Sequence, residues 1–118
     1  MYNIQTLNKI SAIGTDIYDK SVYSFSDDYS NPDAIMVRSA NMHDMTFGDK
    51  LIAIARAGAG VNNIPVDRCA QEGICVFNTP GANANAVKEL AICALLLSSR
   101  KITESAAWAA SLKGTPDA

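Results

Sequence analysis

One stretch of the sequence, Leu51 to Asn63, combines residue types that can bind an anion. An apolar run ends at Arg56, and the turn Gly58-Ala59-Gly60 follows almost at once. Because glycine has no β-carbon, a ligand can approach such a turn closely and φ can become positive. Successive amides of the turn can then point into one concavity and bind an anion. The alternative is a tight turn between a strand and a helix, with Arg56 in a structural ion pair.

A second arginine occupies the same kind of position. The apolar segment Ala34 to Val37 leads into Arg38 and Ser39. Strands that alternate with helices favour a parallel sheet, and such sheets bind ligands beyond the carboxyl ends of their strands. If the two strands are neighbours, Arg38 and Arg56 project to one edge, where two planar guanidinium groups suit a phosphate or a carboxylate. The alternative is a pair of ordinary surface arginines.

Residues for catalysis are scarcer than residues for binding. His43 is the single histidine, and its loop-like context predicts a polar surface residue rather than a general base. Asp27 and Asp28 indicate a solvated loop, because no third ligand follows at a metal-binding spacing. The sequence contains no P-loop, no Gly-x-Ser-x-Gly and no Gly-x-Gly-x-x-Gly motif. We therefore expect an anion-binding half-site without a metal site or a catalytic apparatus.

Short strands, separated by turns and short helices, must position these residues. We expect strands at residues 4–7, 34–38, 51–55 and 74–77, an edge strand at residues 22–25, and a helix over residues 66–71. Pro65 suits the first turn of that helix, with asparagine caps before it, and Gly73 suits the position just past its end. This order predicts an α/β fold with a parallel sheet and flanking helices.

A single long helix is predicted from about residue 84 to residue 111. Its residues are good helix formers, no glycine or proline interrupts them, and Asn83 or Asn85 can cap the start. Every residue from Ala91 to Leu97 is apolar, and a helix that is apolar all round must be covered on all sides. We therefore expect this helix to pack between two partners: a neighbouring domain, a second subunit, or both.

Composition restricts the classes of function. The chain has 118 residues, is 48% hydrophobic and carries a net charge of -2, which fits a modest globular protein and gives no case for nucleic-acid binding. Its longest apolar run is too short to span a membrane, and its first residues lack the features of a signal peptide. Cys69, Cys75 and Cys93 lie in apolar or helical contexts, so we expect reduced, buried thiols in a cytoplasmic protein.

Three segments together resemble a known family. They are Val37 to Ala40, Ile54 to Pro65 and Asn78 to Leu90. In this order and spacing they resemble the amino-terminal part of the D-isomer-specific 2-hydroxyacid dehydrogenases, over about residues 2–112. The resemblance implies a flavodoxin-like substrate-binding domain in residues 1–82. Residues 83–118 would then form a long interdomain and dimerisation helix, at the start of an NAD-binding domain that lies beyond this chain.

The resemblance also implies roles in substrate binding. Arg38 and Arg56 would help to hold the phosphate of 3-phosphoglycerate or 3-phosphohydroxypyruvate, and Ser39 would be a further substrate-binding residue. The amides of Gly58, Ala59 and Gly60 would hold the substrate carboxylate. The expected partner is therefore a small anionic acid.

Roles in cofactor binding and assembly are implied in the same way. Ala59 would also lie near the nicotinamide, and Asn85 would approach the NAD cofactor from the side of the interdomain cleft. Residues 84–112 would form the interface of a homodimer.

The catalytic groups of the family have no counterpart in this sequence. The resemblance places the catalytic histidine, its partner glutamate, the arginine that polarises the keto oxygen and the dinucleotide-binding glycine motif beyond residue 118. We therefore interpret the chain as a truncated, inactive amino-terminal piece of an NAD-dependent oxidoreductase of serine biosynthesis. Two alternatives stay open: a family member that acts on a non-phosphorylated 2-hydroxy acid, and a stand-alone anion-binding module that dimerises through residues 84–112.

Overall fold

The computed structural model describes residues 1–116 of the chain. The chain divides into two compact units, Met1–Ala82 and Asn83–Ala118. The last two residues of the predicted 83–118 segment lie outside the described residues. The function that the sequence assigns to each unit stays a prediction.

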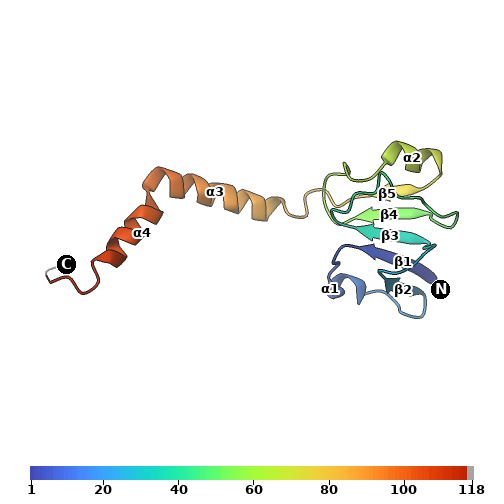
Figure 1. Cartoon of the computed structure of the whole chain (residues 1–118), viewed down its shortest axis with the longest axis horizontal. Helices are drawn as coiled ribbons and strands as arrows, with labels where there is room; N and C mark the ends of the chain where they lie inside the picture. Colours follow the sequence, from blue (N-terminus) through green and yellow to red (C-terminus); the bar gives the residue numbers. More distant parts are fainter. Residues whose placement is uncertain (117–118) are drawn as a thin grey trace. The chain divides into compact units, whose positions relative to one another are not determined.

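The first unit is built on a five-stranded sheet in the order β2-β1-β3-β4-β5 (Figure 1). The strands are β1 (Tyr2–Leu7), β2 (Tyr23–Ser26), β3 (Ala34–Val37), β4 (Ala53–Arg56) and β5 (Cys75–Phe77). Every neighbouring pair is parallel, so the carboxyl ends of all the strands meet at one edge. The predicted α/β class is confirmed, and β2 is the edge strand that the sequence predicts.

Two short helices belong to this unit, α1 (Ala12–Thr15) and α2 (Val66–Gln71). The second spans the predicted residues, and Gly73, just past its end, has a φ of +74°. The Gly73 amide donates to the Ala70 carbonyl (3.3 Å) and the Ile74 amide to the Cys69 carbonyl (2.8 Å), which together make a Schellman motif. The predicted asparagine caps are wrong, because Pro65 occupies the N-cap position and no side chain caps the helix.

The core covers one face of the sheet. Ile54 of β4 lies in register beside Ile35 of β3, and Val37 follows Ile35 on the same face. Cys69 of α2 and Met42 of the segment after β3 are fully buried against these side chains. Burial of each such side chain is worth roughly 1.5–3 kcal/mol. This packing holds α2 against β5 and fixes the segment after β3, which begins at Arg38, on the core of the sheet.

The cysteines correct one prediction. Cys69 is buried as expected, but Cys75 and Cys93 are exposed. Cys75 lies on an edge strand, where Val76 and not Cys75 points to the core face. Cys93 belongs to a helix that has no buried residue.

The second unit contains α3 (Ala84–Arg100) and α4 (Ile102–Ser111) rather than one continuous helix. Lys101 separates them in a left-handed conformation, with φ 49° and ψ 41°. No glycine or proline marks this break. The hydroxyls of Ser98 and Ser99 donate to the carbonyls of Leu95 and Leu96 in the last turns of α3, and such bonds compete with the helical ladder. Asn83 is at the N-cap of α3, but its side chain makes no capping bond.

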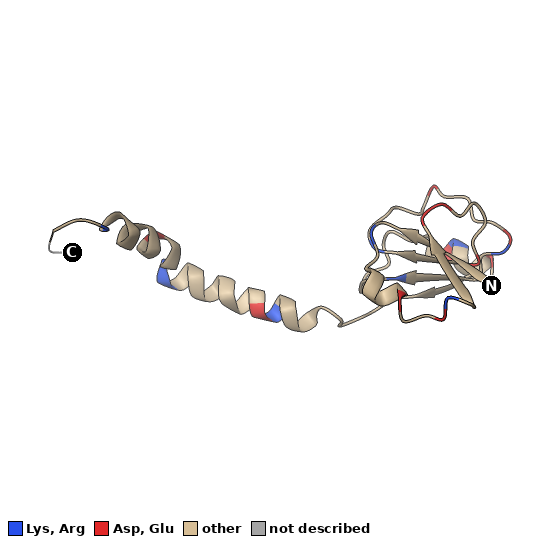
Figure 2. Cartoon of the chain, turned by 90° about the horizontal axis from the view of Figure 1, so that it is seen from below, with Lys and Arg blue, Asp and Glu red and all other residues tan. Residues whose placement is uncertain are grey.

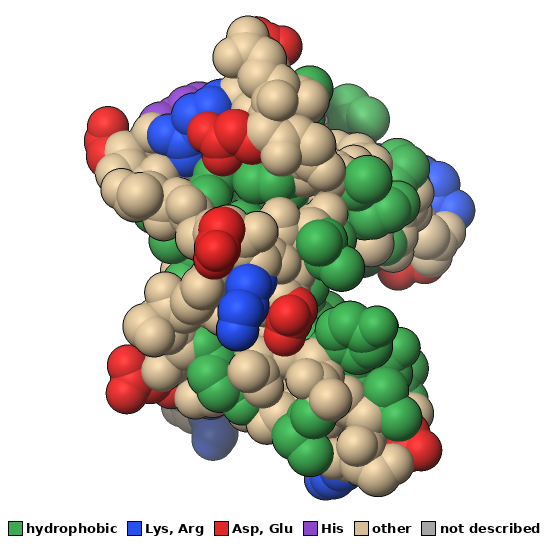
Figure 3. Space-filling model, turned by 90° about the vertical axis from the view of Figure 1, so that its right-hand side faces the viewer, with side chains coloured by type: hydrophobic (Ala, Val, Ile, Leu, Met, Phe, Trp, Pro, Cys, Tyr) green, Lys and Arg blue, Asp and Glu red, His purple; other side chains and the backbone are tan. Residues whose placement is uncertain are grey.

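Charged side chains are unevenly spread over the chain. The central part of α3, from Leu90 to Ser99, carries none, and Figure 2 shows this uncharged stretch. On the first unit, apolar side chains reach the surface in patches that lie among charged ones (Figure 3).

Among residues 1–116, no helix has the length and hydropathy needed to cross a bilayer.

Candidate anion-binding site

The candidate site lies at the carboxyl ends of β3 and β4. The two strands are direct neighbours, with Val37 beside Arg56 in register. Beyond this pair the Ala57 amide donates to the Val37 carbonyl (2.8 Å), so the chain stays paired as it leaves the sheet. Sequence analysis places Arg38 and Arg56 at one edge if their strands are neighbours, and the two strands are neighbours. The segments that begin at Arg38 and Arg56 therefore emerge side by side.

The guanidinium of Arg56 is engaged by the protein itself. Its Nε donates to the carbonyl of Arg38 (3.0 Å), and its Nη1 donates to the carbonyl of Gly60. Within residues 1–116 it forms no ion pair, so the alternative of a structural ion pair is wrong, and bonds to backbone oxygens hold the side chain instead. Arg56 therefore ties the segment after β3 to the glycine turn, and only its Nη2 remains without a partner in the described part of the chain.

The two glycines make room for this side chain. A β-carbon on Gly58 would lie 3.0 Å from Nη1 of Arg56, and one on Gly60 would lie 3.3 Å from the same atom. Neither glycine has a positive φ, so that part of the sequence argument is wrong. The absent β-carbons admit the guanidinium of Arg56, whereas the sequence suggested that they admit a ligand.

The amides of the glycine turn are only partly committed. The Gly58 amide donates to the Arg56 carbonyl (2.9 Å) inside the turn. From the segment after β5, the Asn78 side chain donates to the Ala59 carbonyl (2.7 Å), and the Thr79 amide donates to the Gly58 carbonyl (3.0 Å). In the described residues the amides of Ala59 and Gly60 have no acceptor. The turn is thus held by its carbonyls, and two amides stay available to a ligand.

The segment Arg38–Ala40 is held by two asparagines, in a role that the sequence does not predict for either of them. Asn8, directly after β1, has φ +69°, and its Oδ1 accepts the amides of Ser39 (2.9 Å) and Ala40 (2.8 Å). Asn63 donates from Nδ2 to the carbonyls of Ala40 (2.9 Å) and Arg38 (3.4 Å). An asparagine just after a strand is a weak signal for Asn8, since this residue tolerates the left-handed conformation. The amide of Ser39 is consequently not free, whereas its hydroxyl and the exposed guanidinium of Arg38 make no bond within residues 1–116.

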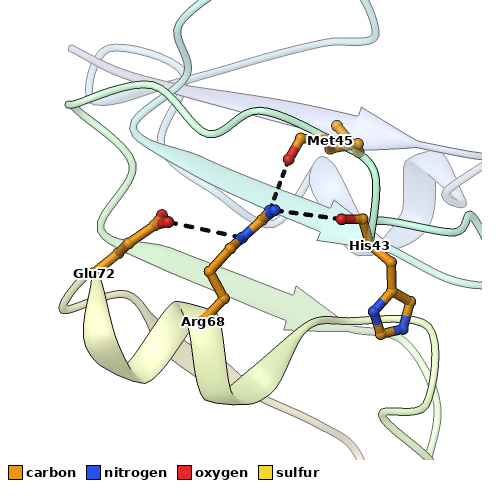
Figure 4. A network of polar contacts seen from close by, with 4 residues as sticks. All are labelled: His43, Met45, Arg68 and Glu72. Atoms are coloured by element: carbon orange, nitrogen blue, oxygen red, sulfur yellow. Dashed lines mark hydrogen bonds and ion pairs between the residues drawn. The ribbon is translucent and has the colours of Figure 1, made fainter.

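A second polar network, centred on Arg68, connects α2 to the segment after β3 (Figure 4). Arg68 of α2 donates from Nη1 to the carbonyl of His43 (3.3 Å) and from Nη2 to that of Met45 (2.7 Å). Its guanidinium also lies 4.2 Å from the centre of the Phe47 ring, and its Nε lies 3.7 Å from Glu72 Oε1. The segment after β3 is thereby fastened to α2.

His43 contributes to the scaffold only from the surface. Its ring is exposed and its Nε2 lies 2.9 Å from the Asn62 carbonyl, which confirms the predicted polar surface role. Asp27 and Asp28 are exposed in the loop between β2 and β3, also as predicted. Among residues 1–116 no group of three or more His, Cys, Asp or Glu side chains could hold a metal ion.

The two residues expected near the cofactor belong to different units. Ala59 lies in the glycine turn of the first unit. Asn85 lies in α3, where its Nδ2 donates to Glu89 Oε1 (2.8 Å) and its Oδ1 accepts from Lys88 Nζ (2.6 Å). The side chain of Asn85 is thus occupied by neighbours on its own helix.

Comparisons with known proteins agree with this architecture. Residues 4–113 match the family described as D-isomer specific 2-hydroxyacid dehydrogenase, catalytic domain. The chain is 40% identical over 76 residues to the D-3-phosphoglycerate dehydrogenase of Mycobacterium leprae, a match that covers 62% of this chain and 14% of that protein. It is 42% identical over 76 residues to the hydroxypyruvate reductase of Thermotoga maritima, covering 62% of this chain and 25% of that protein.

A solved structure shares the fold. The crystal structure of NAD+-bound 3-phosphoglycerate dehydrogenase from Entamoeba histolytica superposes with a TM-score of 0.67 at 27% identity. The match covers 81% of this chain and 38% of that one. The chain therefore spans well under half the length of each of these relatives.

Proposed function

The chain belongs to the D-isomer-specific 2-hydroxyacid dehydrogenases, a family of oxidoreductases, and from this premise we propose that it is the amino-terminal, substrate-binding part of a cytoplasmic NAD-dependent D-3-phosphoglycerate dehydrogenase. The whole enzyme would oxidise 3-phosphoglycerate to 3-phosphohydroxypyruvate in serine biosynthesis, and this part alone would be inactive. The observation that carries the proposal is the unpaired guanidinium of Arg38 at the same strand edge as two free amides.

Each end of a phosphorylated three-carbon acid has a candidate partner at this edge. Arg38, with the Ser39 hydroxyl, would bind the phosphate, and Arg56 would add its remaining Nη2 donor. The amides of Ala59 and Gly60 would bind the carboxylate, since adjacent backbone amides form a concavity for anions. The Gly58 amide would support the turn from within rather than touch the substrate, because it already donates to the Arg56 carbonyl.

NAD would supply the hydride acceptor, but the described residues do not form its main site. The Gly-x-Gly after β4 has no third glycine, and the side chain of Arg56 spans its loop. We therefore assign no step of the reaction through NAD to these residues. Their part would be to bind and orient the acid, with Ala59 as the contact towards the nicotinamide. Asn85 would reach the cofactor only after releasing its bonds to Lys88 and Glu89.

Substitution of Arg38 tests the substrate. In the full-length protein, Arg38→Ala should raise the KM for 3-phosphohydroxypyruvate roughly tenfold or more, because a charge-assisted bond to phosphate is lost. The KM for hydroxypyruvate, which has no phosphate, should change little. Equal effects on the two substrates would favour the alternative of a non-phosphorylated 2-hydroxy acid. The similarity to a hydroxypyruvate reductase supports that alternative.

The second unit supports a proposed homodimer through residues 84–112. Its helices bury no residue, and large apolar side chains such as Leu90, Leu95 and Trp108 are about two-thirds exposed or more. Sedimentation of the 118-residue chain at micromolar concentration should show self-association, which Leu95→Glu should weaken. A monomer at this concentration would contradict the proposed homodimer.

A stop codon directly after residue 118 in the gene would favour the stand-alone anion-binding module over the enzyme.

A further inference from the structure

A groove of about 720 Å³ opens at the carboxyl ends of β1, β3 and β4. Lys9 and Ser11 line it from the turn after β1, Met36 and Arg38 from β3 and its end, and Ala57 from the end of β4. The charged side chains that line it, Lys9 and Arg38, are both cations, and no carboxylate lines it. The rest of the lining is mostly apolar, so the groove is suited to an anion through these two cations, at the edge where parallel sheets bind ligands.

The two cations of the groove are not neutralised by the protein. Within residues 1–116 neither Lys9 nor Arg38 has an ion-pair partner, whereas Lys20 lies 3.0 Å from Asp16. No side-chain hydrogen bond engages either of them in the same part of the chain. An anion between two cations is attracted by both and relieves their mutual repulsion. Arg56 differs from both residues, because Nε and Nη1 already donate to backbone carbonyls.

The position of Lys9 is set by the residue before it. Asn8 has φ +69°, and its Oδ1 accepts from two successive amides after Arg38. The turn after β1 is therefore pinned to the segment after β3, although the two are about 30 residues apart in sequence. Lys9 and Arg38 face one groove because of this link.

We propose that Lys9 is a second phosphate-binding cation, which forms with Arg38 a two-residue clamp that binds the phosphate monoester of the substrate. Asn8 and Arg56 are positioning residues of this clamp: they hold the turn after β1, the segment after β3 and the glycine turn against one another. The proposal rests on the proposed function, and it adds a residue from a third strand end to the anion site.

Kinetics of the full-length protein test the clamp. Lys9→Met should raise the KM for 3-phosphohydroxypyruvate roughly tenfold, with kcat within about twofold, because binding and not chemistry loses a partner. The KM for hydroxypyruvate should stay near that of the wild type, and Lys9→Arg should retain most of the affinity. Lys50→Met is the matched control, because Lys50 is an exposed lysine near the opposite, amino end of β4.

The outcomes separate the two proposals. An unchanged KM in Lys9→Met, with a raised KM in Arg38→Ala, would overturn the role of Lys9 and leave the proposed function standing. A wild-type protein that turns over no phosphorylated acid would overturn the proposed function instead.

A binding measurement decides the role of Lys9 without turnover. In the ¹⁵N-labelled 118-residue chain, inorganic phosphate should shift the amide resonances of Lys9 and Arg38. Lys9→Met should abolish the shift at Arg38 or raise the required phosphate concentration roughly tenfold, whereas Lys50→Met should not. Unperturbed resonances elsewhere would show that the variant is folded. Absence of the shifts in the wild type, or their persistence in Lys9→Met, would overturn the inference.

Discussion

The two units of this chain treat their apolar side chains in opposite ways. In the first, Val37 and Ile54 are fully buried and the sheet depends on them. In the second, Leu90 and Leu95 are 71% and 68% exposed, yet α3 and α4 are regular helices. A helix satisfies its backbone bonds locally, whereas a parallel sheet needs partners that are distant in sequence. The first unit is therefore stabilised by its own core, and the second presents an apolar surface for something else to cover.

The largest expected effect tests this difference directly. Ile54→Ala should lower the free energy of unfolding of the first unit by about 2–5 kcal/mol, because it leaves a cavity in the core. Leu95→Ala should change that value by less than about 0.5 kcal/mol, because its side chain lies outside this core. Urea titrations can follow both units, since the tyrosines lie in the first and Trp108 in the second.

The same titration can show that the two units do not differ in this way. A large loss of stability in Leu95→Ala at concentrations where the chain is monomeric would show that α3 is covered within the chain. A loss that appears only at concentrations where the chain associates would support the proposed dimer. Concentration dependence of the Trp108 transition therefore separates the two cases.

Two arginines at helix ends offer the next contrast. Arg68→Ala should cost the first unit about 1.5–3 kcal/mol, because the carbonyls of His43 and Met45 lose a charged donor. Its contact with the Phe47 ring would be lost as well. Arg100→Ala, in the last turn of α3, should have little effect on the tyrosine transition. Equal destabilisation by both variants would contradict the separate stability of the units.

Local sequence signals predicted most of the first unit. Short apolar runs predicted the strands, and Gly73 predicted the end of α2, because a left-handed residue past a helix is a local requirement. The break at Lys101 had no such signal, since neither glycine nor proline stands there. Helix propensity alone favours one continuous helix in that region.

The sequence predicts those features of the site that depend only on which residues end neighbouring strands. The adjacency of Arg38 and Arg56 follows from the order of parallel strands. The partners of Arg56 do not, because they are backbone carbonyls chosen by the folded path of two loops. Asn8 was missed for the same reason: it binds amides 31 and 32 residues away. Pairing across such separations is set by the assembled core, and no local pattern encodes it.

Asn8 gives a smaller effect that sharpens the account of the site. Asn8→Gly keeps the left-handed backbone but removes the acceptor of the Ser39 and Ala40 amides, so it should cost about 1 kcal/mol. Asn8→Asp keeps an acceptor at this position and should cost less. Tyrosine-monitored urea unfolding measures both, and the order of the two variants would be reversed if only backbone strain mattered.

The smallest effect concerns the thiols, which differ between the units as the apolar side chains do. Burial raises the pKa of Cys69, so its thiol should resist iodoacetamide in the native chain, whereas Cys75 and Cys93 should react.

Because the folded pKa of Cys69 is above the unfolded value of about 8.5, its contribution to stability is complete below that pH and declines as pH rises. The urea midpoint of the tyrosine transition should therefore fall slightly between about pH 7 and pH 9.5, and Cys69→Ala should reduce this slope while Cys93→Ala should not. Rapid native alkylation of Cys69 would mean that the core beneath the two arginines opens readily, and that the first unit resembles the second more than its burial indicates.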